Sequence, residues 1–89
     1  MLFRSAFDAT VARYVSSREW HPSQQVDTQA DGSIVVTLNV CVDRALRAWV
    51  LGFGATARAL EPAALAADLT GELARAMTRY GTAIDAARG

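Results

Sequence analysis

Residues 31 to 42 read DGSIVVTLNVCV, a turn signal followed by a run in which every second residue is apolar. Side chains of a β-strand alternate between its two faces, so one face of this strand carries Ile34, Val36, Leu38, Val40 and Val42. The opposite face is half apolar as well, with Val35, Thr37, Asn39 and Cys41. Two largely apolar faces predict a strand over Ser33–Val42 that lies inside a sheet.

The residues before this strand predict a β-hairpin. Asp31-Gly32 is typical of a tight primed turn, in which the central residues take positive φ angles. On the other side of the turn, Ser23–Gln29 is predominantly polar. A polar strand buries little on either face, so we expect this first strand of the hairpin at the edge of the sheet.

The residues before the hairpin have apolar side chains at helical spacing. Ser5 or Asp8 is a candidate N-cap, and Pro22 lies beyond the helix end because residues before proline avoid the α region. The predicted helix runs from about residue 7 to residue 17, and its apolar stripe consists of Phe7, Val11, Tyr14 and Val15.

A second helix is predicted after the hairpin, with Asp43 as its N-cap. Gly52 and Gly54 are expected to end it. A phosphate-binding loop would open a helix, whereas the glycines of GFGAT (residues 52–56) close one, so helix capping is the favoured interpretation. The apolar residues of this helix are Leu46, Trp49, Val50 and Phe53.

The remainder predicts a short strand and a long helix. Ala55–Leu60 is interpreted as a weak edge strand, and Pro62 suits the first turn of the helix that follows. Gly71 interrupts this last helix at a cost of about 1 kcal/mol. Its stripe consists of Leu65, Leu69, Leu73, Met77, Tyr80 and Ile84.

With Leu2–Arg4 as a stub of a first strand, the order becomes βαββαβ followed by a helix. This is an α+β, ferredoxin-like split βαβ pattern with a small antiparallel sheet, and its first strand lies between the third and the fourth. A stub this short is expected to leave an open slot with unpaired backbone groups, which invites a strand from another chain. We therefore predict a homodimer, formed by strand or element exchange.

Composition restricts the class of protein. The chain has 89 residues, 52% of them hydrophobic, and a formal net charge of zero, so we expect one small globular domain spanning residues 1–89 without an overall field for nucleic acid. The longest apolar run, Ala48–Phe53, is too short to span a membrane. The single cysteine excludes an internal disulfide, and the first residues lack a signal-peptide pattern, so a cytoplasmic location is expected.

Chemically reactive residues are few, and we expect no enzyme. His21 is the only histidine. To act as a general base it would need partner side chains placed near it by the fold. The favoured interpretation is structural: the ring packs beside Trp20 and satisfies a backbone group. One histidine and one cysteine make no zinc site, and no cofactor is expected. Cys41 is expected to be a small buried hydrophobe.

Aromatic and arginine side chains leave a binding role open. Trp20, Trp49 and Tyr14 are candidate stacking platforms for bases, although the place of Trp49 on an apolar stripe favours the core. The candidate contacts for a ligand or nucleic acid are Arg18, Trp20, His21, Arg44 and Arg47.

Several segments occur in an order that resembles one family. They are REWHPSQ (18–24), DGSIVVTLNV (31–40), LRAWVLGFG (46–54), ALEP (59–62) and a final helix that reaches Tyr80. This succession resembles the C-terminal extension, or WCX domain, of WYL-domain transcriptional regulators, over about residues 7–80. Family members are usually longer, with a helix-turn-helix and a WYL barrel before this module; neither is found in the chain, and no residue is assigned to DNA binding.

The resemblance implies a non-enzymatic module of a bacterial regulator. Such a module supports homodimerisation and helps the WYL barrel respond to an effector, which in some relatives is a single-stranded nucleic acid. The alternative, from another class, is a free-standing ferredoxin-like domain that binds a small metabolite.

Overall fold

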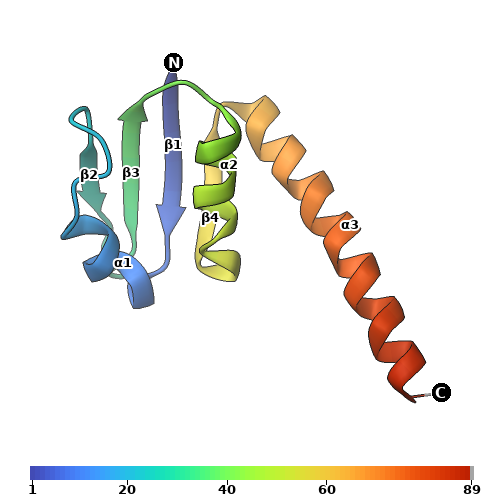
Figure 1. Cartoon of the computed structure of the whole chain (residues 1–89). Coiled ribbons are helices and arrows are strands. Elements are labelled where there is room, and N and C mark those ends of the chain that lie inside the picture. The colour runs from blue at the N-terminus through green and yellow to red at the C-terminus, as the bar shows by residue number, and fades with distance from the viewer. Residues whose placement is uncertain (89) are drawn as a thin grey trace.

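The computed structural model describes the backbone of residues 1–88 and the side chains of residues 1–81. Four antiparallel strands form one sheet, and two short helices, α1 and α2, lie on one of its faces while a long helix, α3, extends away from it (Figure 1). The elements are β1 (Leu2–Phe7), α1 (Ala9–Ser16), β2 (Gln25–Thr28), β3 (Ile34–Asn39), α2 (Arg44–Leu51), a 3-10 turn (Gly54–Thr56), β4 (Ala57–Glu61) and α3 (Ala63–Arg88).

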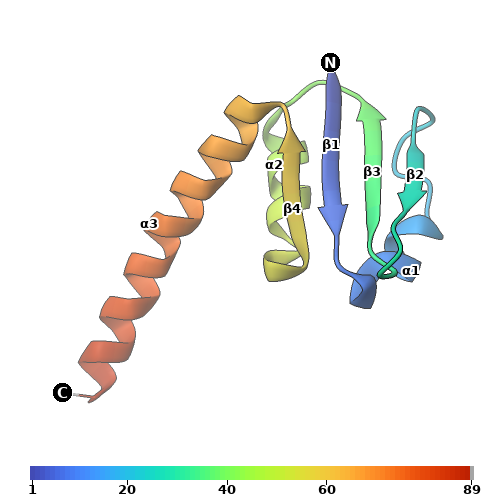
Figure 2. The same ribbon diagram turned by 180° about the vertical axis from the view of Figure 1, so that it is seen from behind.

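The strand order is β2-β3-β1-β4. The central position of β1, the internal position of β3 and the edge positions of β2 and β4 agree with the predictions. Two strands are shorter than predicted, since β2 begins at Gln25 and β3 ends at Asn39. The helix-free face of the sheet is visible from behind (Figure 2).

The predicted stub at the N-terminus is wrong. β1 has six residues and pairs with β3 from Leu2↔Asn39 to Phe7↔Ile34. Alternation explains its length, because Phe3, Ser5 and Phe7 are all buried on the helix-covered face. Asp8, rather than Ser5, caps α1 by accepting a hydrogen bond from the Thr10 N–H at 3.4 Å. A full β1 fills the central slot, so the predicted reason for strand exchange is removed.

The core lies between the sheet and the helices. Ser5 is the one buried polar residue among the described side chains, and its hydroxyl donates to the Arg58 carbonyl of β4 at 3.1 Å. Six of the seven aromatic residues join one cluster of ring contacts: Phe3, Phe7, Tyr14, Trp20, Trp49 and Phe53. The buried apolar residues are Phe3, Phe7, Val15, Ile34, Val36, Leu38, Val50, Leu65 and Leu69.

The hairpin turn differs from the predicted primed turn. Only Gly32 of the turn has a positive φ, at 88°, while Asp31 does not. The Gly32 N–H donates to the Gln29 carbonyl at 3.1 Å and the Gln29 N–H donates to the Ser33 carbonyl at 2.8 Å. The loop is therefore a three-residue connection in which glycine takes the left-handed position next to the strand.

Asp31 should make this turn sensitive to acid. Its carboxylate accepts hydrogen bonds from the Ser33 hydroxyl at 2.6 Å and the Ser33 N–H at 2.9 Å, and these bonds lower the pKa of Asp31 below the ordinary 3.8. A pKa that folding lowers contributes stability above the unfolded-state pKa, and the contribution is lost as the pH falls through the folded-state pKa. We expect the Asp31→Asn variant to lack this loss of stability as the pH falls below the ordinary carboxyl pKa. NMR titration of the Asp31 side chain checks the prediction, and a midpoint at or above 3.8 would contradict it.

Candidate functional site

Hydrogen bonds within the segment between α1 and β2 hold that segment in place. Gln24 accepts a hydrogen bond from the Trp20 N–H through Oε1 and donates to the Arg18 carbonyl through Nε2, both at 2.9 Å. The Gln24 N–H also donates to the His21 carbonyl at 3.0 Å. These three bonds satisfy backbone groups that neither a helix nor a strand would pair. The segment 18–24, called the corner below, is thus a fixed turn.

His21 and Ser23 attach the corner to the sheet. The Ser23 N–H donates to His21 Nδ1 at 3.1 Å, and the Ser23 hydroxyl lies 2.7 Å from the same nitrogen. The Asn39 N–H, at the end of β3, donates to Ser23 Oγ at 2.8 Å. Because a backbone N–H can only donate, Nδ1 is the acceptor, and the neutral ring carries its proton on Nε2. The ring thus satisfies a backbone group, as the structural interpretation of His21 predicts.

Trp20 joins the corner to α1 and α2. Its Nε1–H donates to the Val15 carbonyl at 2.9 Å, and its ring centroid lies 5.2 Å from that of Trp49. The side chain is half-buried and packs against the core. Trp49 is half-buried as well, and the ring contacts that it makes with Phe3 and Phe7 place it in the aromatic cluster.

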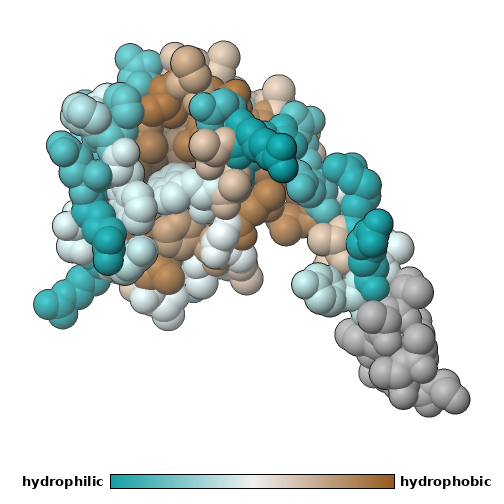
Figure 3. Space-filling view, viewed as in Figure 1, coloured by the Kyte–Doolittle hydropathy of each residue, from teal (hydrophilic) through white to brown (hydrophobic). Residues whose placement is uncertain are grey.

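A cavity of about 350 Å³ opens between the corner, the end of β3 and the start of α2. Two indole rings, three aliphatic side chains and a narrow set of polar groups line it: Trp20, His21, Leu38, Val40, Cys41, Asp43, Leu46 and Trp49. Apolar surface is visible near the end of β3 and the start of β1, beside the start of α2 (Figure 3).

Two residues of the cavity differ in how their polar atoms are satisfied. Asp43 caps α2, as predicted, by accepting a hydrogen bond from the Leu46 N–H at 2.9 Å through Oδ1. Among the described side chains, the Nε1 of Trp49 is the one buried polar atom without a hydrogen-bond partner. An unpaired buried N–H destabilises a fold by about 1–3 kcal/mol. The position of Trp49 is therefore set by ring packing.

The structure brings together only part of the predicted contact set. Trp20 and His21 line the cavity, and Arg44 is exposed at the start of α2, next to Asp43. Arg18 faces a different hollow and lies over the Tyr14 ring, 4.5 Å from its centroid. The prediction of a buried Cys41 is wrong, because β3 ends before it and leaves the side chain exposed at the cavity.

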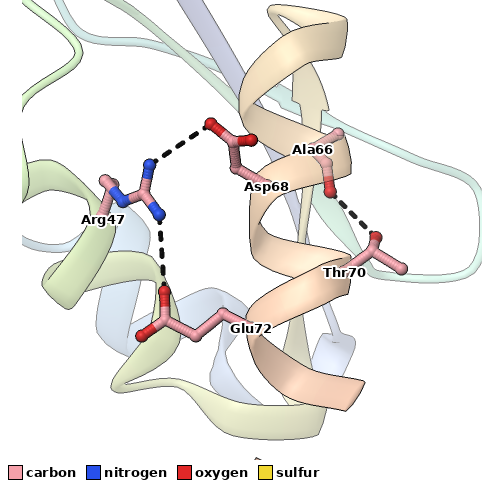
Figure 4. A network of polar contacts seen from close by, with 5 residues as sticks. All are labelled: Arg47, Ala66, Asp68, Thr70 and Glu72. Atoms are coloured by element: carbon pink, nitrogen blue, oxygen red, sulfur yellow. Dashed lines mark hydrogen bonds and ion pairs between the residues drawn. The ribbon is translucent and has the colours of Figure 1, made fainter. Parts of the chain in front are cut away.

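Arg47 is engaged within the chain. Its guanidinium lies 3.4 Å from an oxygen of Asp68 and 3.4 Å from an oxygen of Glu72, which are one turn apart on α3 (Figure 4). These pairs are partly exposed and contribute little stability each, about 0–1 kcal/mol. They link α2 to the first half of α3. A phosphate group would have to compete with both carboxylates for this arginine.

α3 carries a second candidate site. Leu65 and Leu69 are buried against the body, but the stripe then leaves it: Leu73 is 49% exposed, and Met77 and Tyr80 are each 73% exposed. Both ribbon views show the far half of α3 away from the sheet (Figures 1 and 2). Ile84, the last residue of the predicted stripe, lies outside the described side chains. Leu73, Met77 and Tyr80 are called the α3 stripe below.

The described part of the chain contains neither a cluster of metal ligands nor a membrane-spanning helix. Over the described residues, no three His, Cys, Asp or Glu side chains gather as metal ligands would. In the same part of the chain, no helix combines the length and apolarity that crossing a membrane requires.

Comparison with known families decides the assignment, since the family model of the WCX domain matches residues 4–77. The chain belongs to the WCX domain family. The match begins within β1, includes the corner and the cavity residues, and ends on α3 at Met77. Membership in the WCX family supports a domain associated with WYL regulators, and no curated protein of similar sequence was found.

Proposed function

We propose that this WCX domain is the non-enzymatic homodimerisation and ligand-response module of a WYL-type bacterial transcriptional regulator. In the full-length regulator the module would follow a helix-turn-helix and a WYL barrel, in the cytoplasm. Family membership supports the regulatory context. The observation that carries the dimerisation role is the α3 stripe, which continues an apolar face beyond the body of the domain.

The α3 stripe has the pattern of a helix interface. Its residues follow one another at steps of four and three, so they lie on one face of α3. Tyr80 is also the one aromatic residue outside the core cluster. Apolar side chains gathered on one exposed face mark protein–protein contact surfaces, in which tyrosine and methionine are enriched.

A second copy of the chain is the proposed occupant. A groove of about 250 Å³ lies between α2, β4 and α3, and Leu69 and Leu73 are among its lining residues. The groove and the stripe therefore share Leu73 and form one continuous apolar surface. Two copies related by a two-fold axis could each lay the stripe along the groove of the other, which gives a self-complementary interface. This route needs no exchange of strands, in keeping with a complete β1.

Light scattering tests the pairing. We expect a molar mass of twice 9.5 kDa at micromolar concentration, and a dissociation constant raised by at least about tenfold in Met77→Asp, because the interface would bury an unpaired carboxylate. Thr78→Asp is the matched control: Thr78 is exposed on α3, on the side away from the stripe, and receives the same charge. A monodisperse monomer, or equal effects of the two variants, would reject the α3 interface.

A second candidate function, a free-standing ferredoxin-like domain that binds a small metabolite, is favoured by the corner cavity. The central position of β1 supports the ferredoxin-like topology for either function. A nucleic-acid effector would bind with strong salt dependence and would be weakened by Arg18→Ala and Arg44→Ala. A neutral metabolite would bind without salt dependence and would be insensitive to both changes.

A further inference from the structure

We infer that the corner cavity binds a flat, uncharged or weakly basic ring compound that carries a hydrogen-bond acceptor and an N–H donor. The inference rests on the ligand-response part of the proposed function, and it is independent of pairing through α3. The volume of about 350 Å³ lies at the small end of the range for small-molecule sites. One or two fused rings fit a space of this size.

The walls of the cavity favour a ring. The indoles of Trp20 and Trp49 are in contact, with an interplanar angle of 55°, and Leu38, Val40 and Leu46 add aliphatic surface. Aromatic pairs gain from offset-stacked and edge-to-face contacts. Both indoles are also held by other parts of the fold: Trp20 by the Val15 carbonyl and Trp49 by Phe3 and Phe7. The wall is therefore formed before a ligand arrives.

The polar groups define the complementary atoms of the ligand. Ser23 occupies Nδ1 of His21, so the polar atom that His21 retains for a ligand is Nε2, a donor in the neutral ring. Asp43 uses Oδ1 for the cap of α2, which leaves Oδ2 as an acceptor. A ligand acceptor would meet Nε2–H, and a ligand N–H would meet Oδ2.

Charge excludes one class of ligand. Asp43 is the one carboxylate among the lining residues, and no arginine lines the cavity. Phosphates and carboxylates would therefore face a like charge without a compensating cation. Neutral rings and weak bases meet no such penalty.

Benzimidazole is the proposed probe, because it presents a ring acceptor and a ring N–H. Trp20 and Trp49 are the only tryptophans, so titration can be followed by tryptophan emission and by their two indole N–H signals in NMR. We expect saturable binding in the millimolar range or tighter, with both indole signals shifted, and binding several-fold weaker for indole, which keeps the N–H but lacks the acceptor.

Two variants locate the site. Cys41→Phe places a ring at the exposed rim of the cavity and should weaken benzimidazole binding at least about tenfold, whereas Ala48→Phe adds the same ring on the outer side of α2 and should not. Asp43→Asn keeps a capping oxygen but can replace Oδ2 with an amide donor, so it should weaken binding several-fold while circular dichroism stays unchanged.

Absence of saturable binding, equal affinity for indole, or equal effects of Cys41→Phe and Ala48→Phe would overturn the inference. None of these results bears on the mass measured by light scattering. Conversely, a monomeric chain that binds benzimidazole would reject pairing through α3 and leave the cavity assignment intact.

Discussion

Replacing Phe7 with alanine is expected to destabilise the domain by about 3–5 kcal/mol. Phe7 is 1% exposed, and its ring lies 5.5 Å from Trp49 and 5.0 Å from Phe53 between centroids. Its backbone joins both neighbours of β1, since it pairs with Ile34 of β3 and Ala57 of β4. Removing the ring would open a cavity where the sheet, α2 and the following turn meet. The loss would be a large part of the free energy of unfolding of a small domain.

Urea unfolding followed by tryptophan emission measures this effect. Leu2→Ala is the matched control, because Leu2 lies in the same strand with 56% of its surface exposed and should cost less than about 0.5 kcal/mol. Phe7→Leu should fall between the two. Equal midpoints for Phe7→Ala and Leu2→Ala would show that the ring does not stabilise the fold.

Phe7 is also a residue for which the sequence pattern does not decide between helix and strand. It stands four residues before Val11, as in a helix, and it alternates with Phe3 and Ser5, as in a strand. Phe7 therefore fits both the helical and the strand period. Its place in a strand is decided by pairing with β3 and β4, which lie far away in sequence. The internal strand β3 could be predicted because its alternation spans six residues, and α2 because Asp43 is a strong N-cap.

The candidate sites were less predictable, for a related reason. The cavity combines residues from the corner, from the end of β3 and from α2. The sequence drew attention to the corner through its single histidine and to Trp49 as an aromatic side chain, but not to their shared site. Arg47 shows the same limit: its partner Asp68 is 21 residues away, so sequence could not distinguish an ion-paired arginine from a free one. The stripe of α3 was predictable, whereas its exposure depends on where the body of the domain ends.

Trp20→Ala is the other change for which we expect a large effect, about 3 kcal/mol. The indole contributes ring contacts with Tyr14, Trp49 and Phe53, and its N–H is bonded to the Val15 carbonyl near the end of α1. Alanine would remove both kinds of contact and detach the corner from α1 and α2. Unfolding followed by far-ultraviolet circular dichroism avoids the loss of the fluorophore.

Trp20→Phe separates the two contributions. Phenylalanine keeps an aromatic ring but has no N–H, so it should cost about 1 kcal/mol, the usual net value of one hydrogen bond. Glu19→Ala, at an exposed neighbour in the corner, should leave the unfolding midpoint nearly unchanged. If Trp20→Phe destabilised as strongly as Trp20→Ala, the bond to Val15 would hold the corner. A small loss in Trp20→Phe and a large one in Trp20→Ala would assign that role to the ring, which is also the surface that Trp20 offers to the cavity.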